Sequence, residues 1–194
     1  YMVQITVLYA LAFRFAYARD NILESEMKRL TAQLYNAPKA IRDVIDNKDE
    51  CQFIASQLVN VETLFFIGRG FDYALSLEGS LKLKEITYIH SEAYAAGELK
   101  HGTLALIDEN ALSVVVICNP ALAEKCCNAV SQIIYRRGKV AVITCLADVA
   151  EKLKDSAAVW LLPQCSAVLS PFVSAVALQL VAYKTAVLLG RDPD

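Results

Sequence analysis

Three ionisable residues, Glu78, Lys82 and Glu85, are spaced i, i+4 and i+7 in a stretch that is otherwise largely apolar. If residues 74–89 form a helix, each residue advances about 100°, so the three side chains share one face within roughly 60°. A lysine between two carboxylates can hold one of them ionised while the other takes and returns a proton. The spacing therefore suits proton transfer at a carbon next to a carbonyl.

The same spacing has an ordinary explanation, because Glu and Lys four residues apart stabilise an exposed helix by about 0.2–0.5 kcal/mol per pair. The position of the row favours the chemical interpretation, since the helix follows a short apolar run that ends in Gly68-Arg69-Gly70. A second stripe of the helix is expected to be its buried face, and it consists of Leu77, Leu81, Lys84 and Tyr88.

The two histidines of the chain lie close to this helix in the sequence. His101, between a lysine and a glycine, titrates in a range that suits proton delivery to a ring oxygen, and the alternative is a structural hydrogen bond. His90 closes the charged helix, where an imidazole can meet free carbonyl groups, so we expect a structural role for it.

A glycine-flanked loop, Gly68-Arg69-Gly70, could cradle a phosphate with its backbone N–H groups. The longer patterns GxGxxG and GxxxxGK[ST] are absent, so neither dinucleotide nor nucleoside-triphosphate binding is expected. The sequence has no metal-binding constellation either, and we expect no cofactor.

Hydrophobic periodicity predicts the elements that position these residues. Four short apolar runs, at residues 63–67, 112–118, 140–145 and 157–162, are typical of buried parallel strands. Helical patterns occupy residues 121–137, 147–154 and 171–189. This alternation predicts an α/β fold with a parallel sheet covered by helices on both faces, and ligands bind such sheets beyond the carboxyl ends of the strands. The Gly68-Arg69-Gly70 loop and the start of the charged helix are expected at that edge.

The first sixty residues are predicted to be helical. Residues 1–19 form an apolar helix without an N-cap, as though the sequence began within a larger protein, and amphipathic helices follow at 23–36 and 38–60. Residues 2–18 could mimic a membrane span or a signal sequence, but Gln4 and Arg14 interrupt them and no cleavage site follows. We expect a helix that is buried in a domain or subunit interface.

Length and composition restrict the class of protein. The chain has 194 residues, of which 56% are hydrophobic and 21% charged, so it can bury a sizeable core and is not disordered. The net charge of −2, without a run of Lys or Arg, argues against a nucleic-acid surface. Without CxxC pairs, the six cysteines are expected to be buried and reduced, which favours the cytoplasm; a disulfide or metal framework is the alternative. They are Cys51, Cys118, Cys126, Cys127, Cys145 and Cys165.

Three segments together resemble the isomerase half of the glutamine–fructose-6-phosphate aminotransferase (glucosamine-6-phosphate synthase) family. They are the Gly68-Arg69-Gly70 loop, residues 77–86 (LEGSLKLKEI) and residues 93–102 (AYAAGELKHG). The resemblance is high over residues 64–108 and looser up to residue 194. It implies the three-layer αβα sugar isomerase (SIS) fold, with residues 1–39 as the end of a first SIS lobe plus a connector. Residues 40–194 then form the second SIS domain, without its C-terminal tail.

The resemblance also implies an activity, in which ammonia from glutamine is placed on fructose 6-phosphate and the product is isomerised to glucosamine 6-phosphate. In it, Glu85 matches the base that moves a proton between C1 and C2, and Glu78 and Lys82 match its companions at the sugar. His101 matches a histidine associated with ring opening, which the family supplies across a homodimer interface. No membrane or nucleic-acid partner is implied.

The departures from the family pattern suggest that the chain acts only as part of a larger enzyme. The phosphate-gripping loop of the first lobe, the lysine of the C-terminal tail and the glutaminase domain are not in this sequence, and Thr103 replaces a common proline. We therefore expect little or no activity from the chain alone. Two alternatives are a non-catalytic sugar-phosphate sensor of a regulator and an enzyme that removes amines from sugar phosphates.

Overall fold

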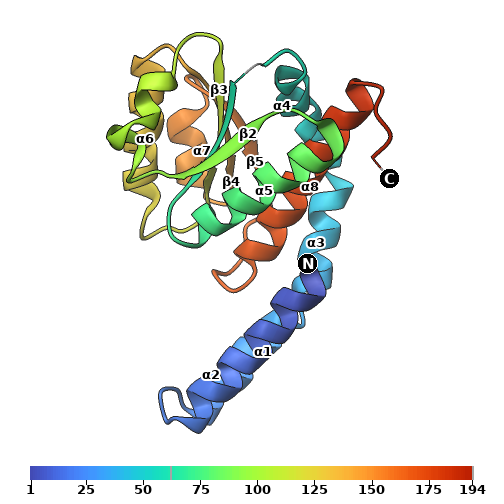
Figure 1. The fold of residues 1–194 in the computed structure, drawn as a ribbon. Helices are drawn as coiled ribbons and strands as arrows, with labels where there is room; N and C mark the ends of the chain where they lie inside the picture. Colours follow the sequence, from blue (N-terminus) through green and yellow to red (C-terminus); the bar gives the residue numbers. More distant parts are fainter. Residues whose placement is uncertain (62, 194) are drawn as a thin grey trace.

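The computed structural model describes residues 1–61 and 63–193, which contain a five-stranded sheet in the order β2-β1-β3-β4-β5 (Figure 1). The strands are β1 (Thr63–Gly68), β2 (Ser91–Ala95), β3 (Ala111–Ile117), β4 (Lys139–Thr144) and β5 (Ala158–Leu161). All neighbouring strands are parallel. Their carboxyl ends therefore meet at one edge of the sheet.

Helices cover both faces of this sheet. On one face lie α4 (Cys51–Leu58), α5 (Phe71–Thr87) and α8 (Ser170–Leu188), and on the other α6 (Ala123–Tyr135) and α7 (Ala147–Leu153). Successive residues of β1 alternate between the two layers, because Leu64 and Phe66 join the first cluster while Phe65 and Ile67 join the second. Burial on both sides explains the unbroken apolar runs. The predicted α/β fold with helices on both faces is confirmed.

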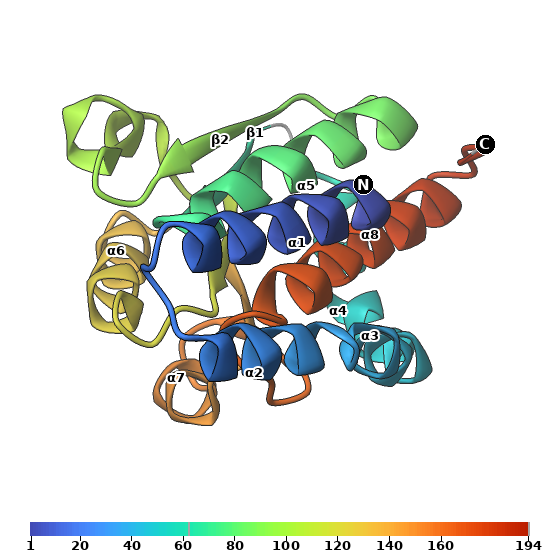
Figure 2. The ribbon, with the colours of Figure 1, turned by 90° about the horizontal axis from the view of Figure 1, so that it is seen from below.

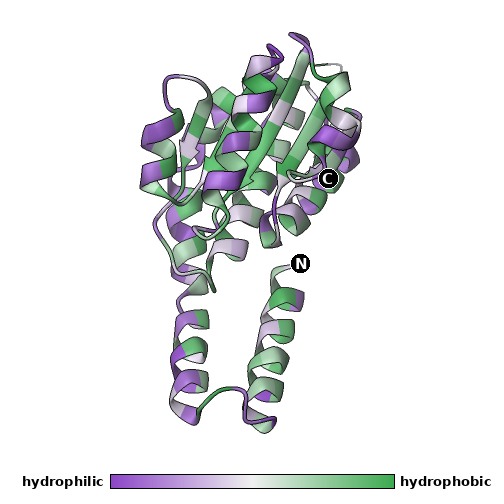
Figure 3. Cartoon of the chain, turned by 90° about the vertical axis from the view of Figure 1, so that its left-hand side faces the viewer, coloured by the Kyte–Doolittle hydropathy of each residue, from purple (hydrophilic) through white to green (hydrophobic). Residues whose placement is uncertain are grey.

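The N-terminal segment projects from this body as a helical hairpin of α1 (Met2–Ala18) and α2 (Glu24–Leu34), and α3 (Ala37–Asp46) leads back to the sheet (Figure 1). Within the hairpin α1 packs against α2, and Figure 2 shows both helices from below. Its contact with the body includes Met2, Ile5 and Tyr9, which pack near Phe172. No residue of α1 is buried within the described chain, although the helix is apolar over most of its length (Figure 3). The burial expected for this helix is therefore not provided by residues 1–61 and 63–193.

The elements differ from the sequence-based expectation at two places. The helix expected over residues 38–60 is divided into α3 and α4 by a short 3-10 turn, η1 (Lys48–Glu50). The Asn47 side chain donates to the Asp43 carbonyl at 2.8 Å, and such local hydrogen bonds compete with helix continuation. In addition, β2 was not expected as a strand. It is one of the two edge strands, and most of its residues are only partly buried, in keeping with its lack of a strong apolar run.

The buried face of α5 is not the one that the sequence analysis expected. Leu77, Leu81 and Tyr88 are 48%, 44% and 75% exposed. The buried residues of this helix are instead mostly small or polar: Asp72, Leu75, Ser76, Gly79, Ser80, Leu83 and Thr87. Small side chains let α5 approach its neighbours closely, because a Cβ added at Gly79 would lie 2.9 Å from a methyl group of Leu178 on α8. The prediction of a buried leucine stripe was wrong.

Among the described helices, α8 alone has the length and hydropathy of a membrane span. Of that stretch, 61% is buried inside the protein, and α8 packs against α3, α4 and α5. Helix α1, the segment that sequence analysis compared with a membrane span, is shorter. The apolar character of α8 is explained by its place in the core between the sheet and the other helices.

Candidate active site

The predicted charged row lies on α5, where it is organised around one ion pair. Lys82 Nζ donates to Glu85 Oε2 at 2.6 Å, and both side chains remain partly exposed. This hydrogen bond, together with the negative charges of Glu85 and Glu78, raises the pKa of Lys82. Lys82 is thus held as an ammonium ion that orients the Glu85 carboxylate.

Glu78 has a different environment, one turn towards the start of the helix. Its Oε1 atom is buried and has no hydrogen-bond partner among the described residues. Leaving such an acceptor unpaired costs about 1–3 kcal/mol, so the position favours a ligand or a further protein group that supplies a donor. Burial, and then the charge of Glu78, raises the pKa of Tyr1.

The charged row runs along the flank of the sheet and not along its carboxyl edge. Helix α5 begins at Phe71, directly after the carboxyl end of β1. At a rise of about 1.5 Å per residue, Glu78 lies about 10 Å and Glu85 about 21 Å further along the helix. The glycine loop and the start of α5 lie at the expected edge of the sheet. Glu78, Lys82 and Glu85 lie further along the helix, away from that edge.

The two glycine-containing motifs meet at that edge. The Ala96 N–H donates to the Gly68 carbonyl at 2.8 Å, and the Arg69 guanidinium lies against Gly97, where an added Cβ would be 3.4 Å from Nη1. Gly68 has no room for a side chain, because a Cβ there would lie 2.3 Å from the backbone of Asp72. Gly70 adopts a φ of 62°, which disfavours other residues. These contacts fix the loops after β1 and β2 to each other.

Asp72 is a buried carboxylate that sequence analysis did not single out. Its Oδ2 accepts the backbone N–H groups of Cys118 at 2.9 Å and Asn119 at 3.1 Å, which ties the first turn of α5 to the end of β3. Burial nevertheless raises the pKa of Asp72 to about 6. A carboxylate in this turn competes with an anion, so phosphate binding by Gly68-Arg69-Gly70 stays a prediction. The sequence feature that could have indicated Asp72 is an acidic residue shortly after the end of an apolar run.

His101 lies apart from the charged row within this chain. It belongs to a 3-10 turn, η2 (Leu99–His101), that precedes η3 (Thr103–Leu106), and its side chain is exposed. In the described part of the chain, no hydrogen bond or ion pair joins it to α5. His90 is also exposed, with Nε2 3.7 Å from Glu92 Oε1. The structure therefore groups Glu78, Lys82 and Glu85 but not His101.

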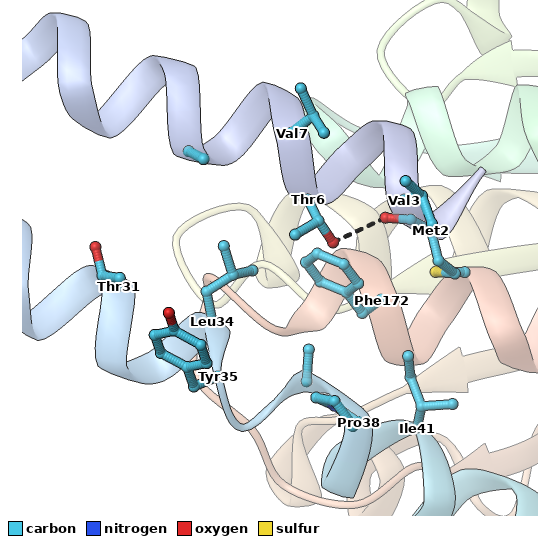
Figure 4. A pocket seen from close by; sticks show the side chains of 12 residues that line it. Met2, Val3, Thr6, Val7, Thr31, Leu34, Tyr35, Pro38, Ile41 and Phe172 are labelled. Atoms are coloured by element: carbon cyan, nitrogen blue, oxygen red, sulfur yellow. Dashed lines mark hydrogen bonds between the residues drawn. The ribbon is translucent and has the colours of Figure 1, made fainter.

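A cleft of about 500 Å³ opens between α1, α2, α3 and the first turn of α8. Figure 4 shows Val7, Leu34, Ile41 and Phe172 around it, with the Thr6 hydroxyl turned to the Met2 carbonyl of its own helix at 2.9 Å. None of the described residues that line the cleft is charged, so it suits apolar side chains and not a sugar phosphate. Within residues 1–61 and 63–193, no three His, Cys, Asp or Glu side chains are placed to hold a metal ion.

Comparison with known proteins places this geometry in a family. The SIS domain model matches residues 57–189. Over its whole length the chain is 40% identical to a glutamine--fructose-6-phosphate aminotransferase [isomerizing] of Caldanaerobacter subterraneus, of which it covers 32%. The chain thus spans about a third of the length of this relative.

Two solved structures extend the comparison. The C-terminal domain of glucosamine-fructose-6-phosphate aminotransferase from Francisella tularensis superposes with a TM-score of 0.89 at 32% identity, over 95% of this chain and 52% of that one. The sugar isomerase domain of an RpiR transcription factor from Sphaerobacter thermophilus gives 0.68 at 15% identity, over 82% and 90% respectively, a likeness of fold alone. With the family model matched across most of its length, the chain belongs to the SIS domain family.

Proposed function

We propose that this chain is the second SIS lobe of the isomerase half of a cytoplasmic glutamine–fructose-6-phosphate aminotransferase. The substrate is a sugar phosphate, fructose 6-phosphate, which with ammonia derived from glutamine becomes glucosamine 6-phosphate. The observation that carries the proposal is the charged row on α5, in which Lys82 holds Glu85 at 2.6 Å and Glu78 keeps a buried oxygen without a partner among the described residues. The similarity to an enzyme of that name over the whole chain supports it.

In this proposal Glu85 is the base that carries a proton between C1 and C2 of the sugar. Its carboxylate is partly exposed and is oriented by Lys82, so it is ready to accept a proton from a carbon that is acidified by the neighbouring carbonyl or imine. The buried oxygen of Glu78 accepts a hydrogen bond from a sugar hydroxyl. His101 assists ring opening, and because it is exposed and distant from the row along the chain, it serves the site of a second copy in a homodimer.

The domain arrangement follows from the same proposal. Residues 1–39 are the end of a first SIS lobe plus a connector, and residues 40–194 are the second SIS domain. The unburied apolar surface of α1 is consistent with packing against other parts of such an enzyme. The chain alone is expected to be inactive or very weakly active.

A deuterium-exchange experiment tests the role of Glu85. The chain is joined at Tyr1 to the preceding residues of the Caldanaerobacter relative and at Asp194 to its C-terminal tail, and loss of the C2 proton of glucosamine 6-phosphate in heavy water is followed by NMR. The Glu85→Gln variant should slow this exchange at least 100-fold, as expected for removal of a general base. The Lys84→Gln variant changes a neighbouring exposed charge outside the row and should exchange at the parent rate.

Equal exchange in the Glu85→Gln variant and its parent would contradict the role of Glu85. If a folded parent protein shows no exchange but binds glucosamine 6-phosphate in calorimetry, the chain is a sugar-phosphate sensor instead. That alternative, like the removal of amines from sugar phosphates, has only a likeness of fold in its favour.

A further inference from the structure

The base proposed above lies in the last turn of its helix. Helix α5 ends at Thr87, so Glu85 belongs to the turn whose carbonyl groups have no partner further along the helix. Such terminal turns open more readily than the middle of a helix. A base that must meet a carbon atom in one orientation therefore depends on contacts that hold this turn in place.

Tyr88 closes α5 in a left-handed backbone conformation, with a φ of 56° and a ψ of 11°. Its N–H donates to the Lys84 carbonyl at 3.1 Å, which completes the last turn of the helix. A bulky side chain is uncommon in this conformation, because its Cβ comes too close to the backbone. The conformation persists where surrounding contacts support it.

Arg191, which follows α8, supplies such a contact. Its guanidinium carbon lies 4.9 Å from the centre of the Tyr88 ring, within the range of a cation–π interaction. The Arg191 N–H donates to the Ala186 carbonyl at 2.9 Å, so its backbone is fixed to the last turn of α8. The Nη1 atom is buried without a hydrogen-bond partner among the described residues. This end of the guanidinium is therefore placed by the aromatic ring and not by an acceptor.

We propose that Arg191 is a positioning residue for Glu85 and that it acts through Tyr88. Helix α8 is buried over much of its length and packs on α5, so Arg191 connects a fixed part of the core to the end of α5. Tyr88 follows Glu85 by three residues. With the Tyr88 ring held, the last turn stays formed and the Glu85 carboxylate keeps its place beside Lys82. This role rests on the proposed function, in which Glu85 is the base.

Loss of the cation–π contact should slow proton exchange without weakening substrate binding. Arg191→Met keeps a long side chain but removes the charge. In the chain joined to the flanking residues of the Caldanaerobacter relative, it should lower the maximal rate of C2 exchange of glucosamine 6-phosphate about 10-fold and change KM less than about 2-fold. A small displacement of a catalytic group reduces the rate of the chemical step more than the affinity.

Two further variants serve as controls for this measurement. Arg191→Lys keeps a cation that can lie over the ring, so it should restore the rate to within about 3-fold of the parent. Arg42→Met removes an exposed arginine of α3 and should exchange at the parent rate. Equal rates for Arg191→Met and its parent would overturn the inference.

A double variant separates positioning from a general structural role. In the Glu85→Gln background, Arg191→Met should slow exchange by less than about 2-fold more, since the group that it positions is gone. If the substitution merely reduced the amount of folded protein, exchange would fall about 10-fold in both backgrounds, which would refute a positioning role. Neither result touches the role of Glu85, whereas equal exchange in Glu85→Gln and its parent would contradict the proposed function itself.

Amide hydrogen exchange gives a test that requires no substitution and no activity. In the unmodified chain, the Tyr88 amide should exchange at most about 100-fold faster than the Leu83 amide inside α5, because the last turn is held. In Arg191→Met it should exchange at least about 3-fold faster than in the parent, while the amides of β3 stay unchanged. A Tyr88 amide in the unmodified chain that exceeds this limit would show that the last turn opens despite Arg191, and the inference would fail.

Discussion

At the residue scale, two acidic side chains of α5 differ in their hydrogen bonding. Asp72 is 2% exposed and accepts two backbone N–H groups, so its hydrogen bonds are internal to the fold. Glu78 has a buried oxygen that receives no hydrogen bond within the described residues. Buried acceptors are normally paired, so the first group acts in the structure and the second is available to a ligand.

The raised pKa of Asp72 predicts a specific dependence of stability on pH. Its pKa is about 6 in the folded chain against an ordinary value of 3.8, so the folded state binds more protons between these values. Stability from this group is therefore greatest below about pH 4 and falls as pH rises through about 6, by about 2–3 kcal/mol in total. The Asp72→Asn variant keeps an acceptor oxygen without the charge and should not show this loss.

Urea unfolding at several values from pH 4 to pH 7 measures the effect. The stability difference, variant minus parent, should grow across this range by about 2–3 kcal/mol, because other titrating groups affect both proteins alike. Parallel pH profiles would show that Asp72 is ionised in the folded state as readily as in the unfolded chain.

At the element scale, α5 packs through a face of small residues and leaves two leucines partly exposed. The added Cβ of an alanine at Gly79 would lie 2.9 Å from a Leu178 methyl group and 3.2 Å from the Phe66 ring. The methyl group of a flexible leucine can move aside, and alanine gains about 1 kcal/mol in helix propensity over glycine. Gly79→Ala is thus expected to change stability by less than about 1 kcal/mol.

A larger substitution at the same position should be far more costly. Gly79→Val adds two further methyl groups between α5, α8 and β1 and is expected to lose about 2–3 kcal/mol through overpacking. Leu81→Val, on the partly exposed face of α5, should cost about 0.5 kcal/mol. The losses are compared by urea unfolding, from the shift of the midpoint concentration in variants that keep the same m-value. Equal losses in the two valine variants would mean that α5 and α8 are not in close contact at Gly79.

The sequence was sufficient for elements with a strong apolar signal and insufficient for those defined by partners elsewhere in the chain. The runs that became β1, β3 and β4 are buried from both sides, and the run of the edge strand β5 is also apolar, so composition alone predicts these four strands. The edge strand β2 pairs with β1 only, and its residues 91–95 lack such a run. The i, i+4, i+7 row was visible in the sequence, but the hydrogen bonds from the Cys118 and Asn119 N–H groups to Asp72 depend on how β3 lies beside α5.

At the scale of the whole molecule, the chain consists of a packed body and a projecting hairpin. The sheet with its two helix layers contains the two large buried clusters, whereas α1 and α2 contain no buried residue. Leu8 and Phe15 of α1 are 64% and 62% exposed, an unusual position for large apolar side chains on a helix. The hairpin therefore contributes little to the stability of the body and offers an apolar surface to other protein.

This division predicts that the body folds without the hairpin. A chain that begins at Ala37 retains α3 and all five strands, and it loses the contacts of α1 and of Leu34 in α2 with the region of Phe172. It should unfold cooperatively, with a midpoint lowered by no more than about 5 °C, as expected for the loss of about 1–2 kcal/mol.

In the intact chain, amides of α1 should exchange with heavy water at least 100-fold faster than those of β3, because local opening of an unburied helix requires little free energy. Leu8→Glu, on the exposed surface of α1, serves as the control and should leave the midpoint unchanged, whereas Val114→Ala in the core strand should lower it. If removal of residues 1–36 abolished cooperative unfolding, or if α1 were as protected as β3, the hairpin would be part of the folding unit and not an appendage to it.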